Sequence, residues 1–183
     1  MYFFIFFQIL NLVINMHVLY ILLATHALAM QDKSLEIAAK VAGDGAPSCT
    51  HYSLSGIKSK CMPFFYVSQS NKIDARSANG EITFTIGSIS KLNDNEFALM
   101  AGHEIAHYYL NHTHSSKAAE LEADKFGAAL ACKAGFDPIA GSTIFRFAHS
   151  NFTHPSAEAR RAAVASVPCP RSNAHEQVTA HQT

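Results

Sequence analysis

The sequence lacks an excess of charge of either sign. Its 183 residues include 14 Lys and Arg and 14 Asp and Glu, so the formal net charge at pH 7 is zero. Charged residues make up only 15% of the chain. A nucleic-acid-binding domain usually carries a clustered basic surface, and this composition offers no such surface. Binding to nucleic acid is therefore not expected.

Basic residues are absent before Lys33, although residues 2–23 are almost entirely apolar. This apolar run is followed by Ala27-x-Ala29, the small-x-small pattern that signal peptidases cleave. We expect residues 1–29 to be a signal peptide cut after Ala29. The alternative is a membrane anchor over residues 2–23, and a start at Met16 would explain the missing basic residues. Either reading puts the following domain outside the cytosol, in the periplasm or secreted.

Cysteines are few, and no two of them have the Cys-x-x-Cys spacing that is typical of thiolate zinc sites. All 4 lie beyond the apolar segment. An even number of cysteines in an exported chain favours disulfides. Three pairings are possible, and nearness in sequence favours Cys49–Cys61 together with Cys132–Cys169.

Internal repeats are also absent, and the length remaining after residue 29 suits one domain over residues 30–170. Apolar periodicity predicts helices, and alternation predicts strands. The expected helices are 31–41, 94–109, 117–133, 138–148 and 155–167, with Pro155 in the first turn of the last one. The expected strands are 64–67 and 81–86, with a tight turn at Asn79-Gly80 before the second. We expect an irregular loop over 48–63 and a disordered tail over 171–183. Together, these helices and strands predict a mainly helical α+β domain with a small sheet.

The segment His103-Glu104-Ile105-Ala106-His107 lies in the second expected helix. Residues four apart on a helix lie on the same face, so both imidazoles can reach one metal ion. Glu104 stands where it can take a proton from water, which is the arrangement of H-E-x-x-H zinc peptidases. The alternative is that the histidines are ordinary polar residues on a helix face. Gly102 weakens the helix but allows another backbone to come close.

A catalytic zinc needs a third protein ligand and one open position. His112 and His114 are out of register with the third histidine of the metzincins. In the next helix, Glu120 and Asp124 are spaced i, i+4 on one face. We favour Glu120 over Glu122 as the ligand, with Asp124 accepting a hydrogen bond from a ligand histidine. The alternative is that these acidic side chains form a solvent-exposed face of the helix and bind no metal.

The segment His103–His107, followed by Glu120-Leu121-Glu122-Ala123-Asp124, resembles zinc metallopeptidase family forty-eight, the family of HtpX and the type-one CAAX prenyl protease. Residues 78–87 and 134–138, Thr153-His154-Pro155 and Arg160 also resemble family segments, and the similarity spans roughly residues 73–167. Soluble periplasmic members such as BepA and LoiP look most similar, because the chain has at most one membrane segment.

The resemblance implies a zincin-like (gluzincin) domain that binds one Zn²⁺ per chain. It implies the ligand set His103, His107 and Glu120, with Glu104 as general base. It further implies that the strand over 81–86 pairs with an extended polypeptide substrate.

The resemblance also brings His154 towards the zinc cleft. There it is expected to act on the reacting carbonyl oxygen or to occupy the open metal position, and helix capping is the alternative.

We therefore expect a zinc-dependent metalloendopeptidase that acts on exported, unfolded or misassembled proteins. The alternative is a catalytically quiet zinc-binding domain that holds client polypeptides as a chaperone does. Retention of Glu104 argues against this alternative, since a structural zinc is normally closed by a fourth ligand and needs no base.

Overall fold

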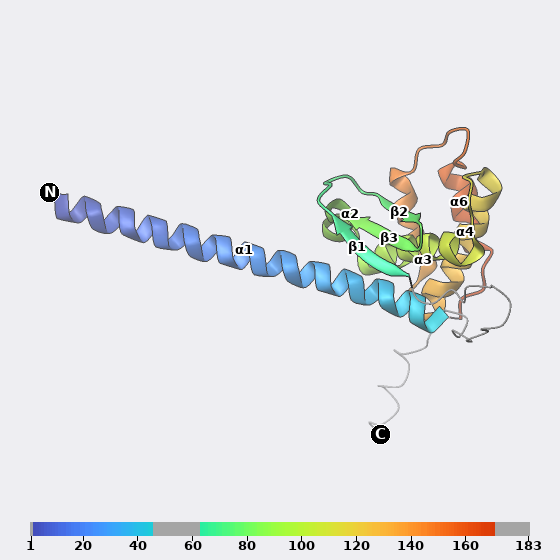
Figure 1. Ribbon diagram of the computed structural model, residues 1–183, viewed down its shortest axis with the longest axis horizontal. Coiled ribbons are helices and arrows are strands. Elements are labelled where there is room, and N and C mark those ends of the chain that lie inside the picture. The colour runs from blue at the N-terminus through green and yellow to red at the C-terminus, as the bar shows by residue number, and fades with distance from the viewer. Residues whose placement is uncertain (1, 46–62, 171–183) are drawn as a thin grey trace, which may run out of the picture. The chain divides into compact units, whose positions relative to one another are not determined.

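The computed structural model describes residues 2–45 and 63–170 (Figure 1). The chain divides into two compact units, Met1–Lys33 and Ser34–Thr183. Helix α1 (Tyr2–Gly45) begins in the first unit and ends in the second. Its last turns carry the predicted helix 31–41, and Ile37, Ala38 and Val41 are buried there.

Among the residues that the structure describes, no helix is long and apolar enough to cross a membrane. The apolar segment over 2–23 lies mostly among residues whose side chains are not described, so the signal peptide and the anchor remain predictions. The loop over 48–63 lies, apart from its last residue, outside the described residues, as do Cys49 and Cys61. The tail over 171–183 lies outside them too.

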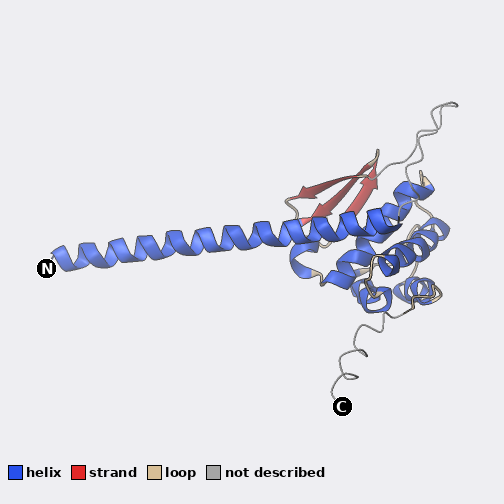
Figure 2. Cartoon of the chain, turned by 90° about the horizontal axis from the view of Figure 1, so that it is seen from below, coloured by secondary structure: helices blue, strands red, loops and turns tan. Residues whose placement is uncertain are grey.

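A three-stranded sheet forms one side of the second unit (Figure 2). Its strands are β1 (Phe64–Ser68), β2 (Ala75–Ala78) and β3 (Glu81–Thr85), in the order β1-β3-β2. Strand β3 pairs parallel with β1 and antiparallel with β2. Asn79 and Gly80 both have positive φ, 52° and 86°, as a tight hairpin turn between β2 and β3 requires. The predicted turn and both predicted strands are confirmed.

Strand β2 was not predicted, and its position corrects the expected substrate strand. Because β3 pairs with a neighbour on each side, residues 81–85 have no free edge for an added peptide strand. Residue 86 already belongs to the helix that follows. The strand that contacts the helix over 94–110 is β2, at the edge of the sheet. Its sequence Ala-Arg-Ser-Ala contains no β-branched or aromatic residue, so propensity gave no signal.

The predicted helices over 94–109 and 117–133 are confirmed as α3 (Asp94–Leu110) and α4 (Lys117–Lys133). A capping box begins α3, in which the Asn93 side chain accepts from Glu96 N–H and the Glu96 carboxylate accepts from Asn93 N–H. Ser116 caps α4. A short helix, α2 (Ile86–Lys91), was not predicted and follows β3 directly, with Thr85 as its cap.

The two C-terminal helical segments are shorter than expected. The segment over 138–148 forms α5 (Pro138–Gly141) and then a 3₁₀ helix, η1 (Ser142–Phe147). The last helix, α6 (Ala157–Ala165), begins two residues beyond Pro155, because the Ser156 side chain caps it by accepting from Ala159 N–H. The prediction that Pro155 lies in its first turn was wrong.

Helices α3 and α4 cross at two glycines. A Cβ atom on Gly102 would lie 2.5 Å from the carbonyl oxygen of Gly127. A Cβ atom on Gly127 would lie 2.5 Å from the backbone nitrogen of His103. The close approach expected of Gly102 is therefore present, and it brings His103 against α4.

A disulfide joins Cys132 at the end of α4 to Cys169 beyond α6. The Cα atoms are 5.7 Å apart, within the range of natural disulfides. This predicted pairing is confirmed, and it is consistent with an exported protein.

Candidate metal centre

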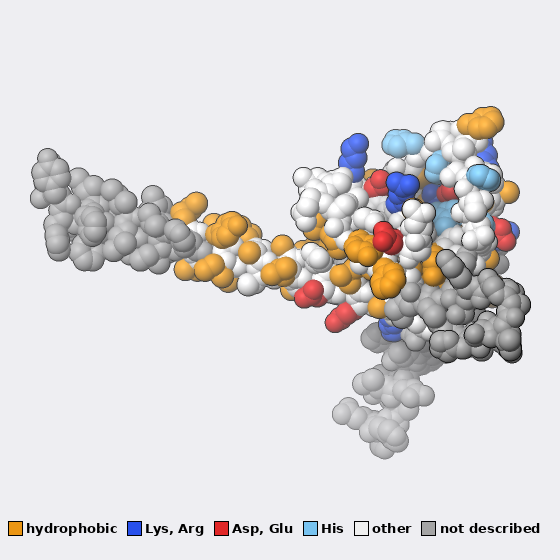
Figure 3. Space-filling model, viewed as in Figure 1, with side chains coloured by type: hydrophobic (Ala, Val, Ile, Leu, Met, Phe, Trp, Pro, Cys, Tyr) orange, Lys and Arg blue, Asp and Glu red, His pale blue; other side chains and the backbone are white. Residues whose placement is uncertain are grey.

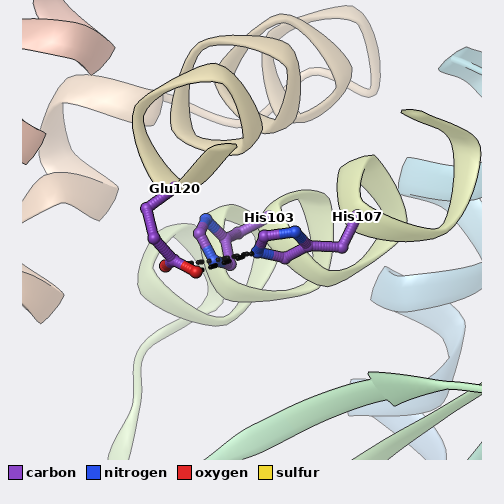
Figure 4. Close-up of side chains that lie close together, drawn as sticks. All are labelled: His103, His107 and Glu120. Atoms are coloured by element: carbon purple, nitrogen blue, oxygen red, sulfur yellow. Dashed lines mark hydrogen bonds and ion pairs between the residues drawn. The ribbon is translucent and has the colours of Figure 1, made fainter. Parts of the chain in front are cut away.

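Three side chains from α3 and α4 point towards one another (Figure 4). The two nitrogens His103 Nε2 and His107 Nε2 are 3.0 Å apart. Glu120 places one carboxylate oxygen 3.4 Å from His103 Nε2 and the other 3.5 Å from His107 Nε2. In the part of the chain that the structure describes, these three residues form the group able to hold a metal ion.

The distances fit a tetrahedral zinc site. Bonds of about 2.0–2.1 Å from zinc to nitrogen or oxygen place neighbouring ligand atoms about 3.3–3.4 Å apart. The two imidazole nitrogens are 3.0 Å apart, and each lies 3.4 or 3.5 Å from a different oxygen of Glu120, so these separations are close to this value. With one ligand atom from each residue, all three atoms lie within 4.8 Å of one another. The donor set of two imidazoles and one carboxylate leaves a fourth position open, as in catalytic zinc sites.

His103 is held by buried partners on its other ring nitrogen. Nδ1 lies 2.9 Å from Asp124 Oδ1, and Arg160 binds both Asp124 oxygens, at 2.8 and 2.6 Å. Burial alone would lower the pKa of His103, but its hydrogen bonds with Asp124 and Glu120 raise that pKa to about 9. Burial alone would raise the pKa of Asp124. The hydrogen bonds from Arg160 and His103 outweigh this effect, so the pKa of Asp124 lies below its usual value.

His107 has a different environment. Burial and the neighbouring charge of His103 lower the pKa of His107 to about 4. Its Nδ1 is 2.8 Å from Nδ1 of His112, and Nε2 of His112 is 3.3 Å from Glu122 Oε2. In the metal-free protein, His103 therefore holds the proton at neutral pH and His107 does not.

Glu104 lies beside the three ligand candidates and accepts a backbone hydrogen bond from Ser77 on β2. Burial is the largest influence on this carboxyl and raises its pKa above the usual value. A raised pKa makes the carboxylate a better proton acceptor, as a general base requires.

His154 reaches the centre from the segment before α6. Its Nε2 is 4.0 Å from Glu120 Oε2, and its Nδ1 is 2.9 Å from Thr153 Oγ1 and 3.1 Å from Asn151 Oδ1. Since Ser156 caps α6, the helix-capping role considered for His154 is excluded. The side chain is 42% exposed.

Two hollows meet at this centre, on the face where Figure 3 shows several histidine side chains. One continues between α3 and η1 and has an apolar wall. The other continues along β2 to the turn after α3 and is more polar. Both are lined by Ala75, His103, Glu104, Glu120 and His154.

Sequence reasoning assigned no role to His112 or Arg160, although both contact the candidate centre. Arg160 lies 36 residues after Asp124 and His112 lies in the turn after α3, so no helical spacing links either of them to its partner. The charge of Asp124 was the available signal for Arg160, because a buried carboxylate needs a cationic partner.

The comparisons with known proteins agree with this geometry. The family model described as peptidase family M48 matches residues 50–119, which includes His103, Glu104 and His107 and ends one residue before Glu120. No curated protein and no solved structure matches the chain significantly. Over the segment that bears the two histidines and Glu104, the chain is thus similar to peptidase family M48, a family of metallopeptidases.

Proposed function

We propose that this chain is a zinc-dependent metalloendopeptidase of family M48. The observation that carries the proposal is the convergence of His103, His107 and Glu120 at mutual distances that fit tetrahedral zinc, with Glu104 beside them. When bound, zinc supplies Lewis-acid activation of water and of the peptide carbonyl. The similarity to family M48 supports both the metal and the reaction class.

Each residue has a separate task in this proposal. The two histidines and Glu120 hold the metal, and Asp124 fixes the ring of His103 through its Nδ1–H. The Glu104 carboxylate accepts a proton from the attacking water and delivers it to the leaving amine. Its raised pKa supports both transfers.

The polypeptide substrate binds as an extended strand along the free edge of β2. Ser77 supports this placement, because its N–H points away from β3 and towards Glu104. A peptide added at this edge therefore lies directly beside the proposed base. The substrates are exported proteins that are unfolded or misassembled, since only an unfolded segment can extend along a strand edge. The Cys132–Cys169 disulfide supports this compartment, and within it we place the chain among the soluble periplasmic members of the family.

Two variants with opposite metal content test the proposal. Glu104→Gln keeps the ligands, so it should retain one zinc per chain and lose casein hydrolysis by about 10²–10⁴-fold or more. Glu120→Gln should lose zinc on dialysis, whereas Glu122→Gln, which alters a side chain that is 64% exposed, should largely retain it. Metal analysis and hydrolysis with and without chelator provide the readouts.

Near wild-type hydrolysis by the Glu104 variant would contradict the assignment of the base. Equal zinc retention in the Glu120 and Glu122 variants would contradict the ligand set. Zinc binding without any chelator-sensitive hydrolysis would favour a zinc-binding chaperone-like domain.

A further inference from the structure

The turn after α3 brings the chain back to the candidate ligand His107. Asn111 ends the helix in a left-handed conformation, with φ 58° and ψ 42°. Asparagine is one of the few residues other than glycine that adopts this conformation readily. The backbone N–H groups of Asn111 and His112 both donate to the carbonyl oxygen of His107. The turn is therefore anchored on the backbone of His107, and it returns the His112 side chain towards the same residue.

The His112 side chain bridges the two helices that carry the candidate ligands. It is 12% exposed. Its Nδ1 lies 2.8 Å from Nδ1 of His107 on α3, and its Nε2 lies 3.3 Å from Glu122 Oε2 on α4. The rings of His107 and His112 meet edge-on, with their centroids 5.0 Å apart and an angle of 70° between their planes. Both ring nitrogens of His112 thus have a partner, one on each helix.

His112 is placed to act through His107 rather than as a further ligand. His107 Nε2 is the nitrogen that faces the candidate centre, 3.0 Å from His103 Nε2 and 3.5 Å from Glu120 Oε1 (Figure 4). His112 contacts the other nitrogen of the His107 ring, Nδ1. Among the described residues, the group able to hold a metal ion contains His103, His107 and Glu120 and does not contain His112.

The hydrogens of this contact can be assigned in one order that leaves a metal ligand free. A neutral imidazole carries one hydrogen, and the hydrogen bond at one nitrogen decides which nitrogen a metal can use. If His107 offers Nε2 to a metal, its Nδ1 carries the hydrogen and His112 Nδ1 accepts it. His112 Nε2 then carries its own hydrogen and donates to the Glu122 carboxylate. Every donor in this order has an acceptor.

The opposite order is unfavourable at both ends. It would place the hydrogen of His107 on Nε2, where it would block the metal position. It would also leave His112 Nε2 without a hydrogen and facing Glu122, although an ionised carboxylate can only accept. The acceptor on α4 therefore favours the order in which His107 Nε2 is free.

The same order holds in the absence of metal. His103 Nδ1 lies 2.9 Å from Asp124 Oδ1, so a carboxylate stands at this end of the chain of hydrogen bonds as well. With Nδ1–H of His103 donating to Asp124, a hydrogen on His103 Nε2 can donate to the bare Nε2 of His107, 3.0 Å away. Metal binding then requires removal of this one hydrogen, while those that His107 and His112 donate stay in place.

We propose that His112 is a positioning residue for the candidate ligand His107, as Asp124 is for His103. Its role is to hold the His107 ring in the tautomer and orientation in which Nε2 faces His103 and Glu120. This role rests on the metal-binding part of the proposed function and does not require catalysis.

Zinc affinity, measured by competition with a chromogenic chelator, tests this role with three variants of His112. His112→Leu removes the acceptor and leaves the His107 Nδ1–H against an apolar side chain, so zinc binding should weaken by about 10–100-fold. His112→Asn can present its amide oxygen at the position of Nδ1 and should restore most of the affinity. His112→Gln places its amide near the position of Nε2, beside Glu122, and should bind zinc as weakly as the Leu variant.

Two matched controls lie beside this contact. His114→Leu makes the same change at an exposed histidine of the same loop and should leave zinc affinity at the wild-type value. Glu122→Gln should also have little effect, because this side chain is 64% exposed and water can replace its carboxylate as the acceptor. No such replacement is available to the His107 Nδ1–H beneath the largely buried His112 ring.

Nuclear magnetic resonance of the wild type reports the tautomers directly. In zinc-loaded protein with ¹⁵N-labelled histidine, the ring signals should place the hydrogen of His107 on Nδ1 and that of His112 on Nε2. A hydrogen on Nδ1 of His112 would overturn the proposal. This measurement needs no variant, so it holds even if a substitution at His112 prevents folding.

The melting temperature of the metal-free variants distinguishes positioning from folding. It should be similar for the wild type and for all three His112 variants. Wild-type zinc affinity in the Leu variant would overturn the role, and so would equal affinities of the Asn and Gln variants. A loss of affinity that follows a lower metal-free melting temperature would also overturn it. Absence of zinc binding by the wild type would overturn the candidate ligand set itself, and the role of His112 with it.

Discussion

At the scale of single residues, the two candidate ligand histidines differ in charge before metal arrives. The pKa of His103 is raised to about 9, so it is protonated at pH 7, whereas that of His107 is lowered to about 4. A metal ion needs the unprotonated Nε2 of both rings. At pH 7, therefore, only His103 has to lose a proton before it can bind the metal, and the free-energy cost of this deprotonation lowers the apparent zinc affinity.

Zinc binding should therefore release about one proton at pH 7 and fewer as the pH rises past the pKa of His103. Below that pKa, the apparent affinity should fall about tenfold for each unit of pH. Calorimetry in two buffers of different ionisation enthalpy measures the protons released. Asp124→Asn weakens the contact that raises the pKa, so it should release fewer protons at pH 7. Zinc binding by the wild type at pH 7 with no proton release would contradict this assignment.

His154 has two roles open to it, and they predict opposite results. Its Nε2 faces Glu120 at 4.0 Å, which suits contact with a reacting oxygen or with the open metal position. If it donates to the carbonyl oxygen, His154→Ala should lower kcat by about 10²–10³-fold at unchanged zinc content. If it blocks the metal in a resting state, the same variant should raise the activity. Steady-state kinetics with metal analysis decide, and unchanged turnover would exclude both roles.

The sequence could predict the residues that a helix spaces regularly. His103, Glu104 and His107 follow from the i, i+4 rule, and Glu120 and Asp124 follow from the same rule one helix later. His112 and Arg160 could not be predicted in this way. Their contacts depend on a left-handed turn and on the packing of α6, which are tertiary features.

At the scale of elements, long periodic segments were predictable and short ones were not. The two site-bearing helices match their predicted ranges to within one residue. Strand β2 and helix α2 are short, and their formation depends on pairing with β3 and on the cap at Thr85 rather than on periodicity. The missed strand is also the edge along which we propose that the substrate binds.

The crossing of α3 and α4 should be the packing feature near the site that tolerates substitution least. Gly102→Ala and Gly127→Ala each place a Cβ atom 2.5 Å from the backbone of the other helix. A gain in helix propensity of about 1 kcal/mol per residue should be outweighed by overpacking, which typically costs about 1–3 kcal/mol and more against backbone. We expect both variants to unfold at lower denaturant concentration and to bind zinc more weakly.

The matched control for this experiment is Lys125→Ala, which changes an exposed residue on α4. It should change neither the free energy of unfolding nor the zinc affinity appreciably. A Gly127 variant as stable as wild type, with intact zinc binding, would show that the helices can separate without cost to the site.

At the scale of the whole molecule, the disulfide connects the metal centre to the end of the fold. Cys132 lies at the end of the helix that begins near Glu120, and Cys169 lies beyond the helix that carries Arg160. The bridge therefore restrains α4 and α6 relative to each other. These two helices hold the Asp124–Arg160 pair behind His103.

The mature protein should contain no free thiol, and loss of this bridge should destabilise it. With a sequence separation of 37 between the two cysteines, the chain-entropy model gives a contribution of about 4 kcal/mol. A Cys132→Ser, Cys169→Ser double variant should unfold at markedly lower denaturant concentration, since so large a loss is a substantial part of a domain's stability. Thiol titration under denaturing conditions, followed by peptide mapping, tests the oxidation state and also the predicted Cys49–Cys61 pairing. Four titratable thiols would contradict both pairings and, with them, the argument for an exported protein.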